Sequence, residues 1–224
     1  MRSAALFDFD NTLIDNDSQG LEVEYFWRRR EISPVRIAHI VFVHLITTLR
    51  IAPKAAIVRA CIATHRGRDR RELFEHGERF FREVTSRRFF PEVVERMREH
   101  KDRGDLVAVL TASPAHLVAP AARVLGVDLV VTTQLEEDAR GLLSGRTRGK
   151  VNIGSVKAEA ARTLLAEHGI DPSRATAYSD DQADLEFLLT TGRAVVVNPT
   201  PRLSRIARKR GWEIIRPLSV SRLD

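Results

Sequence analysis

The sequence predicts an α/β protein, a parallel sheet covered by helices on both faces, with a mostly helical insertion after the first strand. Residues 1–15 and 89–224 alternate short apolar runs of strand length with helical stretches, the pattern of a doubly wound, Rossmann-like sheet. Residues 16–88 read as helical almost throughout, interrupted by Pro34 and Pro53. We therefore expect a core domain formed by 1–15 and 89–224 and a helical cap (lid) formed by 16–88.

The first element is a buried strand that ends in two carboxylates. The apolar run is followed by Asp8 and Asp10, one residue apart, and then by the turn-former Asn11. The carboxyl ends of parallel strands form the edge where open α/β sheets bind their ligands. Two carboxylates there raise each other's pKa unless a cation lies between them or one is protonated. Hard oxygen ligands favour Mg²⁺; a strand followed by an Asp-rich turn is the alternative interpretation.

The predicted cap contains an apolar segment, Ile37–Leu49, that is too short at 13 residues to span a bilayer. Basic residues flank it on both sides, namely Arg28, Arg29, Arg30, Arg36, Arg50 and Lys54. A buried helix of the cap is one interpretation, and an apolar substrate wall or a membrane-touching surface are the others. Because the insertion follows the first strand, we expect it to lie over Asp8 and Asp10 as a lid.

Further strands and helices complete the predicted core. The strands are Leu106–Leu110, Asp128–Thr132, Ala175–Tyr178, Ala194–Val197 and Glu213–Ile215. The helices run from Ser113-Pro114 to about Leu125, over Ser155–His168, from Asp181 to about Thr191, and over Pro201–Arg210. Between Gln134 and Thr147, two glycines at 141 and 145 indicate a small hairpin.

Polar residues follow two of these strands or lie near the start of a helix. Thr111 follows the second strand, where a hydroxyl and backbone N–H groups at a helix N-terminus can bind phosphate. Lys157 lies near the start of its helix and could neutralise carboxylate and phosphate charge; Lys150 is the competing lysine. Asp180 and Asp184 follow a later strand and could complete a metal site. Asp181, between them, has the character of a helix cap or an exposed residue, and a metal ligand is the alternative interpretation.

The order of these sequence motifs resembles that of the haloacid-dehalogenase-like phosphatase superfamily, and more closely that of its phosphoserine-phosphatase-like branch. The resemblance extends over essentially the whole chain. The first motif, Asp-x-Asp-x-Thr, stands here at residues 8–12. The second, a hydroxyl residue that ends a hydrophobic strand, matches Thr111. The third-motif lysine matches Lys157, and the fourth-motif acidic pair matches Asp180 and Asp184.

The resemblance implies a phosphatase that works through an aspartyl-phosphate. Asp8 would be the nucleophile, and Asp10 would protonate the leaving oxygen and then act as base on the attacking water. Thr111 and the backbone N–H of Ala112 would hold phosphate oxygens, and Lys157 would neutralise phosphate charge. Mg²⁺ would be the cofactor, and the implied metal set is Asp8, Asp10 through its carbonyl, Asp180, and Asp184 from the second shell.

The substrate is less sharply indicated. In phosphoserine phosphatases an acidic residue nine positions after the nucleophile binds the substrate's amino group, and Asp17 stands there. This favours a small amino-bearing phosphomonoester such as phosphoserine or histidinol phosphate. Two departures from the family pattern are Thr111-Ala112-Ser113 in place of Ser-Gly-Gly, and Ala183 in place of an Asn. The apolar, arginine-flanked cap segment resembles lids of bacterial phosphatases that act on phosphatidylglycerol phosphate, so a lipid phosphate is the alternative.

Other functions remain as alternatives: a phosphotransferase that passes phosphate to an alcohol, or a non-catalytic module that binds anionic membranes. The net charge of +6 favours anionic partners, but no nucleic-acid motif accompanies it, so we expect no nucleic acid partner. The single Cys61 excludes an internal disulfide, and the N-terminus lacks a leader pattern. We expect a cytoplasmic setting, with peripheral contact to the membrane as the variant; the sequence leaves the oligomeric state open. Arg59 and Arg66 are substrate-contact candidates by position only.

Overall fold

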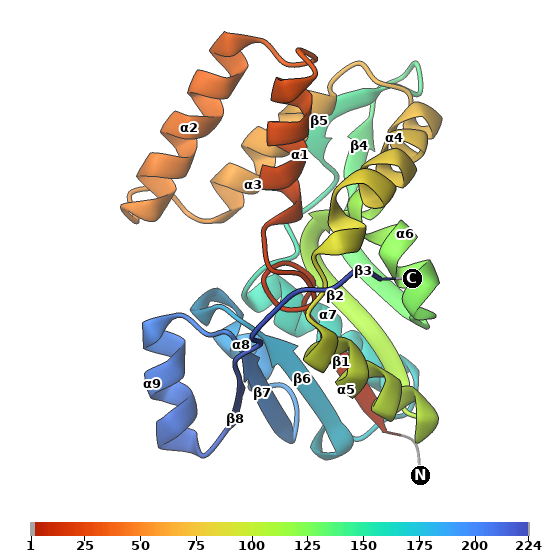
Figure 1. Ribbon diagram of the computed structural model, residues 1–224, viewed down its shortest axis with the longest axis vertical. Coiled ribbons are helices and arrows are strands. Elements are labelled where there is room, and N and C mark those ends of the chain that lie inside the picture. Colours follow the sequence, from red (N-terminus) through yellow and green to blue (C-terminus); the bar gives the residue numbers. More distant parts are fainter. Residues whose placement is uncertain (1–2, 224) are drawn as a thin grey trace.

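The computed structural model describes residues 3–223 and contains a six-stranded, entirely parallel sheet. Its strand order is β3-β2-β1-β6-β7-β8, so the first strand of the chain, β1 (Ala4–Phe7), lies in the middle (Figure 1). The others are β2 (Leu106–Pro114), β3 (Leu129–Thr133), β6 (Ala175–Ser179), β7 (Arg193–Val197) and β8 (Glu213–Ile215). The predicted fold class, a doubly wound α/β sheet, is confirmed.

The strand register brings the chemistry-bearing residues to one edge. Phe7 of β1 lies opposite Val109 of β2 on one side and Tyr178 of β6 on the other. Asp8 directly follows β1, Thr111 lies within β2 two residues beyond Val109, and Asp180 directly follows β6. Parallel strands put all three positions at the same carboxyl edge.

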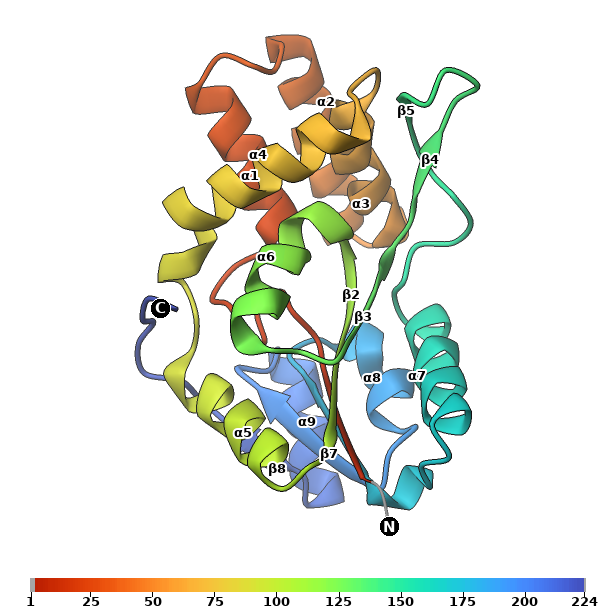
Figure 2. The same ribbon diagram turned by 90° about the vertical axis from the view of Figure 1, so that its right-hand side faces the viewer.

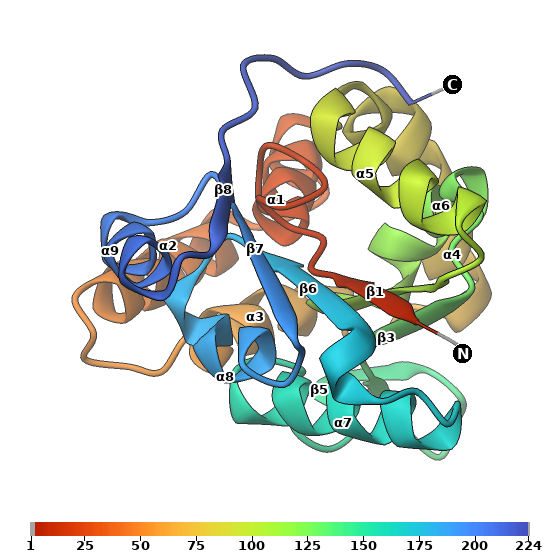
Figure 3. The same ribbon diagram turned by 90° about the horizontal axis from the view of Figure 1, so that it is seen from below.

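Helices cover both faces because alternate side chains of each strand point to opposite sides. Ala5 and Phe7 pack with α5 (Pro91–Asp102) and α6 (Ala115–Leu125). Ala4 and Leu6 pack in a separate core with α7 (Ser155–Glu167), α8 (Leu185–Leu188) and α9 (Pro201–Arg210). Figure 3 shows the two layers on opposite sides of the sheet.

The predicted elements differ from the observed ones in three places. β2 continues to Pro114, so α6 begins at Ala115, two residues later than the sequence indicates. The helix expected to reach about Thr191 is a 3₁₀ turn, η4 (Gln182–Asp184), followed by the four-residue α8. Helix α5 received no separate prediction. The hairpin is confirmed as β4 (Leu135–Glu137) and β5 (Leu143–Thr147).

The expected helical segment lies above the carboxyl edge of the sheet (Figure 1). It consists of α1 (Ser18–Arg28), α2 (Pro34–Thr48), α3 (Ala55–Ile62), α4 (Arg70–Glu83) and the 3₁₀ turns η1 (Ala63–His65) and η2 (Thr85–Arg87). Pro34 starts α2, with the Ser33 side chain accepting a hydrogen bond from Arg36 N–H, because proline fits the first helical turn. None of the helices within residues 3–223 is long and apolar enough to cross a membrane.

The two connections between this helical segment and the sheet meet at a bridge between Ile14 and Phe89. The hairpin reaches upward to the helical segment (Figure 2): Gly67 N–H donates to the Leu143 carbonyl (2.8 Å), and Leu143 N–H donates to the Arg68 carbonyl (2.9 Å). The predicted division assigns the hairpin to the core domain. In the structure the hairpin packs against the helical segment and forms one side of it. The domain boundaries remain a prediction.

Candidate active site

A pocket of about 140 Å³ opens between the carboxyl edge of the sheet and the helical segment. Seven of the eight residues singled out from the sequence line it: Asp8, Asp10, Asp17, Ala112, Lys157, Asp180 and Asp184. The eighth, Thr111, is fully buried beside it. These residues come from five separate parts of the chain, which the parallel sheet brings together.

Lys157 is the central cation of the pocket. Its side chain is 1% exposed, and its Nζ lies 2.9 Å from Asp8 Oδ1 and 2.5 Å from Asp184 Oδ2. Burial alone would lower the pKa of Lys157, but Asp184 and Asp8 outweigh it and raise that pKa, so the ammonium stays charged. Lys150, the competing candidate, is exposed and outside the pocket lining.

Asp8 is fixed by several contacts besides this lysine. The N–H of Phe9 donates to Asp8 Oδ1 (2.8 Å), and the Asp8 N–H donates to the Tyr178 carbonyl of β6 (2.9 Å). Burial raises the pKa of Asp8 to about 7, although Lys157 pulls it down. The carboxylate therefore depends on nearby positive charge to remain ionised.

The pocket holds more negative than positive charge. Asp180 is not paired with a cation in the way that Asp8 is, and burial, together with Asp8, Asp181 and Asp184, raises its pKa well above the usual value. A cluster of buried carboxylates with this imbalance is stabilised by a bound cation.

Asp10 is held by hydroxyl and backbone donors. Ser113 Oγ donates to Asp10 Oδ2 (2.6 Å), and Ser18 N–H donates to Asp10 Oδ1 (2.7 Å). The Thr111 hydroxyl lies 3.4 Å from Asp10 Oδ2 and accepts the Ser113 N–H (3.0 Å). Burial, with repulsion from Asp17, raises the pKa of Asp10 to about 6.

The helical segment supplies the outer part of the pocket. Asp17 caps α1 by accepting the Gly20 N–H (2.9 Å) and also lines the pocket. Lys54, before α3, forms an ion pair with Asp181 (2.6 Å), and Asp181 also caps η4. Arg59 and Arg66, which position alone suggested, are both exposed and outside the pocket lining.

Sequence reasoning missed several polar residues at this site. Ser113 was placed at a helix start, but it belongs to the extended end of β2, on the same side as Thr111 two residues earlier. Lys54 was noted only as a flank of the apolar segment. No sequence motif marks Ser18 and Gln19 as site residues, because their contacts with the site depend on how α1 is placed against the sheet.

Known proteins are similar to this chain in sequence. The sequence pattern of the haloacid dehalogenase-like hydrolases matches residues 5–189. A Mycobacterium tuberculosis protein named phosphoserine phosphatase SerB1 is 34% identical over 219 residues, covering 96% of this chain and 70% of the relative. A histidinol-phosphatase of Neisseria meningitidis is 25% identical, covering 96% of this chain and 99% of the relative.

Solved structures share the fold. A protein of unknown function from Bordetella pertussis has a TM-score of 0.85 at 26% identity, covering 96% of this chain and 98% of that one. A phosphoserine phosphatase solved as a phospho-aspartyl intermediate analogue has a TM-score of 0.70 at 20% identity, covering 98% and 95%. The chain belongs to the haloacid dehalogenase-like hydrolase family, in its phosphoserine-phosphatase-like branch.

Proposed function

We propose that this protein is a Mg²⁺-dependent phosphomonoester phosphatase that transfers the phosphoryl group to Asp8. The observation that carries the proposal is the buried Asp8 at the pocket floor, 2.9 Å from the ammonium of Lys157. A carboxylate can attack a phosphate only where positive charge neutralises the repulsion between the two anions. Membership of a hydrolase family and relatives with phosphatase names support the same reaction.

The donor set suits Mg²⁺. The raised pKa of Asp180, caused by burial and then by its neighbouring carboxylates, marks an excess of negative charge among hard oxygen donors. Asp8, Asp180 and the Asp10 carbonyl would hold the ion, with Asp184 ordering its surroundings through Lys157 and Ser179. When bound, Mg²⁺ would neutralise phosphoryl charge and orient the group for in-line attack.

The chain's own residues then account for both half-reactions. An Asp8 carboxylate oxygen bonds to phosphorus while the ester P–O bond breaks, and Asp10 gives its proton to the leaving alkoxide. Asp10 next removes a proton from water, which attacks phosphorus and releases phosphate and free Asp8. The raised pKa of Asp10, about 6 because of burial and Asp17, suits a group that holds a proton and then gives it up. Thr111 and the Ala112 N–H are the proposed phosphate contacts.

We infer a small amino-bearing phosphomonoester as substrate. Asp17 lies on the pocket wall and can pair with an ammonium group. The relatives named phosphoserine phosphatase and histidinol-phosphatase act on substrates of this kind by their names. The small pocket volume, about 140 Å³, also suits a small molecule.

A second candidate, a lipid phosphate at a membrane surface, is favoured by the outer face of α2. Val35, Phe42 and Leu45 on this helix and Leu49, its C-cap residue, are 80%, 58%, 53% and 60% exposed. Arginines flank the helix, so this face could rest on an anionic membrane. Peripheral membrane contact would then bring the substrate headgroup to the lid.

Phosphate release with Mg²⁺ tests these proposals. The panel contains phosphoserine, histidinol phosphate, an aryl phosphate and phosphatidylglycerol phosphate in mixed micelles, each with and without glycerol as acceptor alcohol. We expect turnover of the amino-bearing substrates, reduced by Asp17→Asn more than turnover of the aryl phosphate. Preference for the lipid would support the second candidate, and a glycerol phosphate product would indicate a phosphotransferase. No turnover of any substrate by folded protein would overturn the proposal.

A further inference from the structure

A second cluster of titratable side chains lies outside the pocket, between the helical segment and the sheet. Glu22 of α1 is surrounded by His65 of η1, His76 of α4 and His116 of α6, each at most 3% exposed. Three of these elements belong to the helical segment, and α6 directly follows β2 of the sheet. The phosphatase mechanism uses none of these four residues.

All three imidazoles face the same carboxylate. The Nε2 atoms of His76 and His116 each lie 2.9 Å from Glu22 Oε1, and the Nε2 of His65 lies 3.2 Å from Glu22 Oε2. The ligand atoms of Glu22, His65 and His116 all lie within 4.8 Å of one another. In a tetrahedral zinc site with bonds of about 2.0–2.2 Å, ligand atoms are about 3.3–3.5 Å apart. Small side-chain shifts would therefore admit an ion.

The protonation of the cluster suits metal coordination. Burial lowers the pKa of His116 to about 4 despite the nearby Glu22, so this imidazole is neutral near pH 7. Burial alone would raise the pKa of Glu22, but His65 and His116 outweigh it and hold that pKa well below its usual value. One carboxylate and imidazole nitrogens form the ligand set that zinc and neighbouring transition metals prefer.

We propose that Glu22, His65 and His116 bind a divalent transition-metal ion, with zinc as the best match, that fastens the cap to the core. His76 contacts Glu22 Oε1 but lies outside the set of ligand atoms that are all within 4.8 Å of one another. The site is separate from the proposed Mg²⁺ site in both position and ligand chemistry, because one is rich in imidazole and the other in carboxylate oxygen.

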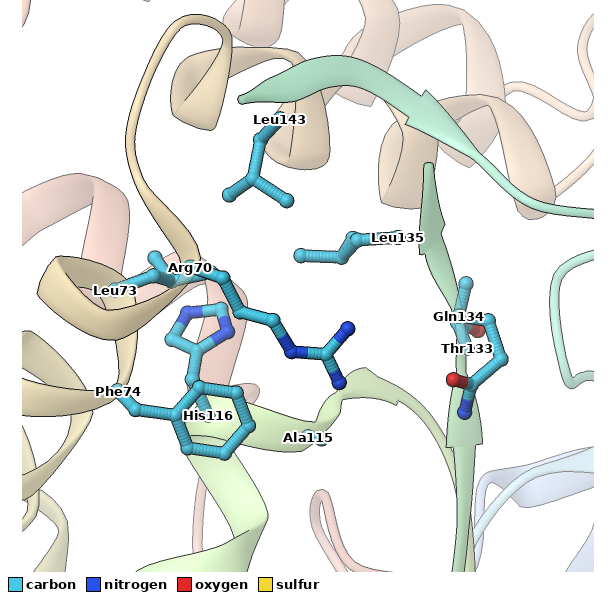
Figure 4. A pocket seen from close by; sticks show the side chains of 9 residues that line it. All are labelled: Arg70, Leu73, Phe74, Ala115, His116, Thr133, Gln134, Leu135 and Leu143. Carbon is cyan, nitrogen blue, oxygen red and sulfur yellow. The ribbon is translucent and has the colours of Figure 1, made fainter. Parts of the chain in front are cut away.

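The tight packing around the Glu22 cluster would give such an ion a structural role. A cavity of about 20 Å³, room for about one water, adjoins His116 between α4, α6 and the hairpin, where Phe74 and Leu73 lie nearby (Figure 4). On the other side α4 approaches α6 so closely that a Cβ on Gly77 would lie 2.1 Å from the His116 carbonyl oxygen. An ion here would have little contact with solvent, and it would join elements that are far apart in the sequence.

The cluster also lies next to the residues that hold Asp10. One turn before Glu22 on α1, the hydroxyls of Ser18 and Ser113 lie 3.0 Å apart, and Gln19 Nε2 donates to Ser113 Oγ (3.3 Å). Ser113 leads directly to His116. An ion that fixes α1 against the β2–α6 connection would therefore keep the cap seated over the pocket.

The test is metal content and metal binding of tag-free, full-length protein. Elemental analysis of the purified protein, and titration of chelator-treated protein with Zn²⁺ and Co²⁺, are done in a large excess of Mg²⁺ to fill the carboxylate pocket. We expect one equivalent of Zn²⁺ or Co²⁺, a tetrahedral-type Co²⁺ spectrum, and a Tm rise of about 5–10 °C at a hundredfold excess over Kd. None of these readouts depends on phosphatase activity.

Matched variants locate the ion. His65→Gln/His116→Gln should weaken Co²⁺ binding by at least about 100-fold, whereas His39→Gln/His44→Gln, which changes two exposed histidines of α2, should bind normally. If His65→Gln/His116→Gln does not fold, Glu22→Gln replaces it. The metal stoichiometry of the wild-type protein tests the proposal without any variant. Absence of bound metal in wild-type protein, or equal binding by folded cluster variants, would overturn the proposal. The cluster would then be a buried hydrogen-bonded node in which three imidazoles contact the carboxylate of Glu22.

Discussion

The protein buries two clusters of ionisable side chains, and they differ in charge balance and in access to solvent. Around Asp8, several carboxylates line a pocket, and two of them, Asp8 and Asp184, pair with the buried Lys157. Around Glu22, one carboxylate meets three imidazoles and little space remains. The first cluster is unbalanced and accessible, so it can take up a cation and a phosphate. The second surrounds its single carboxylate with three imidazole partners and is nearly dry, which suits a joint between parts of the molecule.

The largest expected effect comes from Asp8→Asn, which removes the proposed nucleophile while keeping its shape. We expect phosphate release to fall by at least about 10⁴-fold, with near-native circular dichroism. Asp171→Asn, which changes an exposed cap residue of a 3₁₀ turn, is the control and should retain activity. Residual turnover of Asp8→Asn near the wild-type rate would show that the carboxylate pocket works in another way.

Lys157→Met should damage both activity and stability. It leaves Asp8 and Asp184 buried without their shared cation, a change that costs about 3–5 kcal/mol of unfolding free energy. We expect the rate to fall by at least about 100-fold, and urea denaturation measures the stability. Lys150→Met, which changes an exposed lysine, should behave as wild type. A stable, active Lys157→Met would contradict the charge balance described for this cluster.

Glu22→Gln should distinguish the roles of the two clusters, because it should reduce stability and leave the rate almost unchanged. It replaces charge-assisted hydrogen bonds with neutral ones and removes a proposed metal ligand, so we expect a loss of about 2 kcal/mol in unfolding free energy. The rate should change by less than about tenfold, since Glu22 lies outside the pocket lining. A rate loss as large as that of Asp8→Asn, without loss of stability, would place Glu22 in the catalytic machinery instead.

Metal-free protein should lose stability as pH rises from about 4 to about 7. Burial raises the pKa of Asp8 to about 7 and that of Asp10 to about 6, above the usual value of 3.8. Between these values the folded state binds more protons at Asp8 and Asp10 than the unfolded state, so each of them lowers the unfolding free energy by about 1 kcal/mol per pH unit. His116, whose pKa burial lowers to about 4, contributes a slope of the opposite sign up to about pH 6.5, which offsets one of the two carboxylates. Thermal melts in chelator should show this slope, and Asp8→Asn should reduce it. A slope of the opposite sign would contradict the burial effect.

The smallest effect is expected from Lys54→Ala. Its ion pair with Asp181 is half exposed on the lysine side, so the loss of stability should be at most about 1 kcal/mol. KM for a phosphorylated substrate should rise a few-fold because a positive charge leaves the pocket wall, while kcat stays close to wild type. Steady-state kinetics measures both. A hundredfold fall in kcat would show instead that the Lys54–Asp181 ion pair is needed to close the helical segment over the pocket.

The sequence predicts the sheet, and that the acidic residues and Lys157 gather at one edge of it, because both follow local rules. Short apolar runs mark the strands, and parallel strands place Asp8, Thr111 and Asp180 at one edge whatever the loops do. Lys157 was identifiable only as part of this set, since a lone helix lysine is ordinarily exposed.

The Glu22 cluster was not predictable from the sequence. Glu22, His65, His76 and His116 have no fixed spacing, and only the docking of the helical segment on α6 brings them together. The hairpin's contact with Gly67 and Arg68 depends on the same docking. Such contacts follow from packing between distant parts of the chain, which no local pattern encodes.

The most direct test of the central claim is to identify the phosphorylated residue during turnover. Protein that is hydrolysing an aryl phosphate with Mg²⁺ is quenched in acid, digested, and mapped by mass spectrometry. The mechanism predicts a transient phosphoryl group on Asp8, absent in Asp8→Asn and absent without substrate. Full turnover with no phosphoryl group on Asp8, or turnover by Asp8→Asn at the wild-type rate, would contradict it.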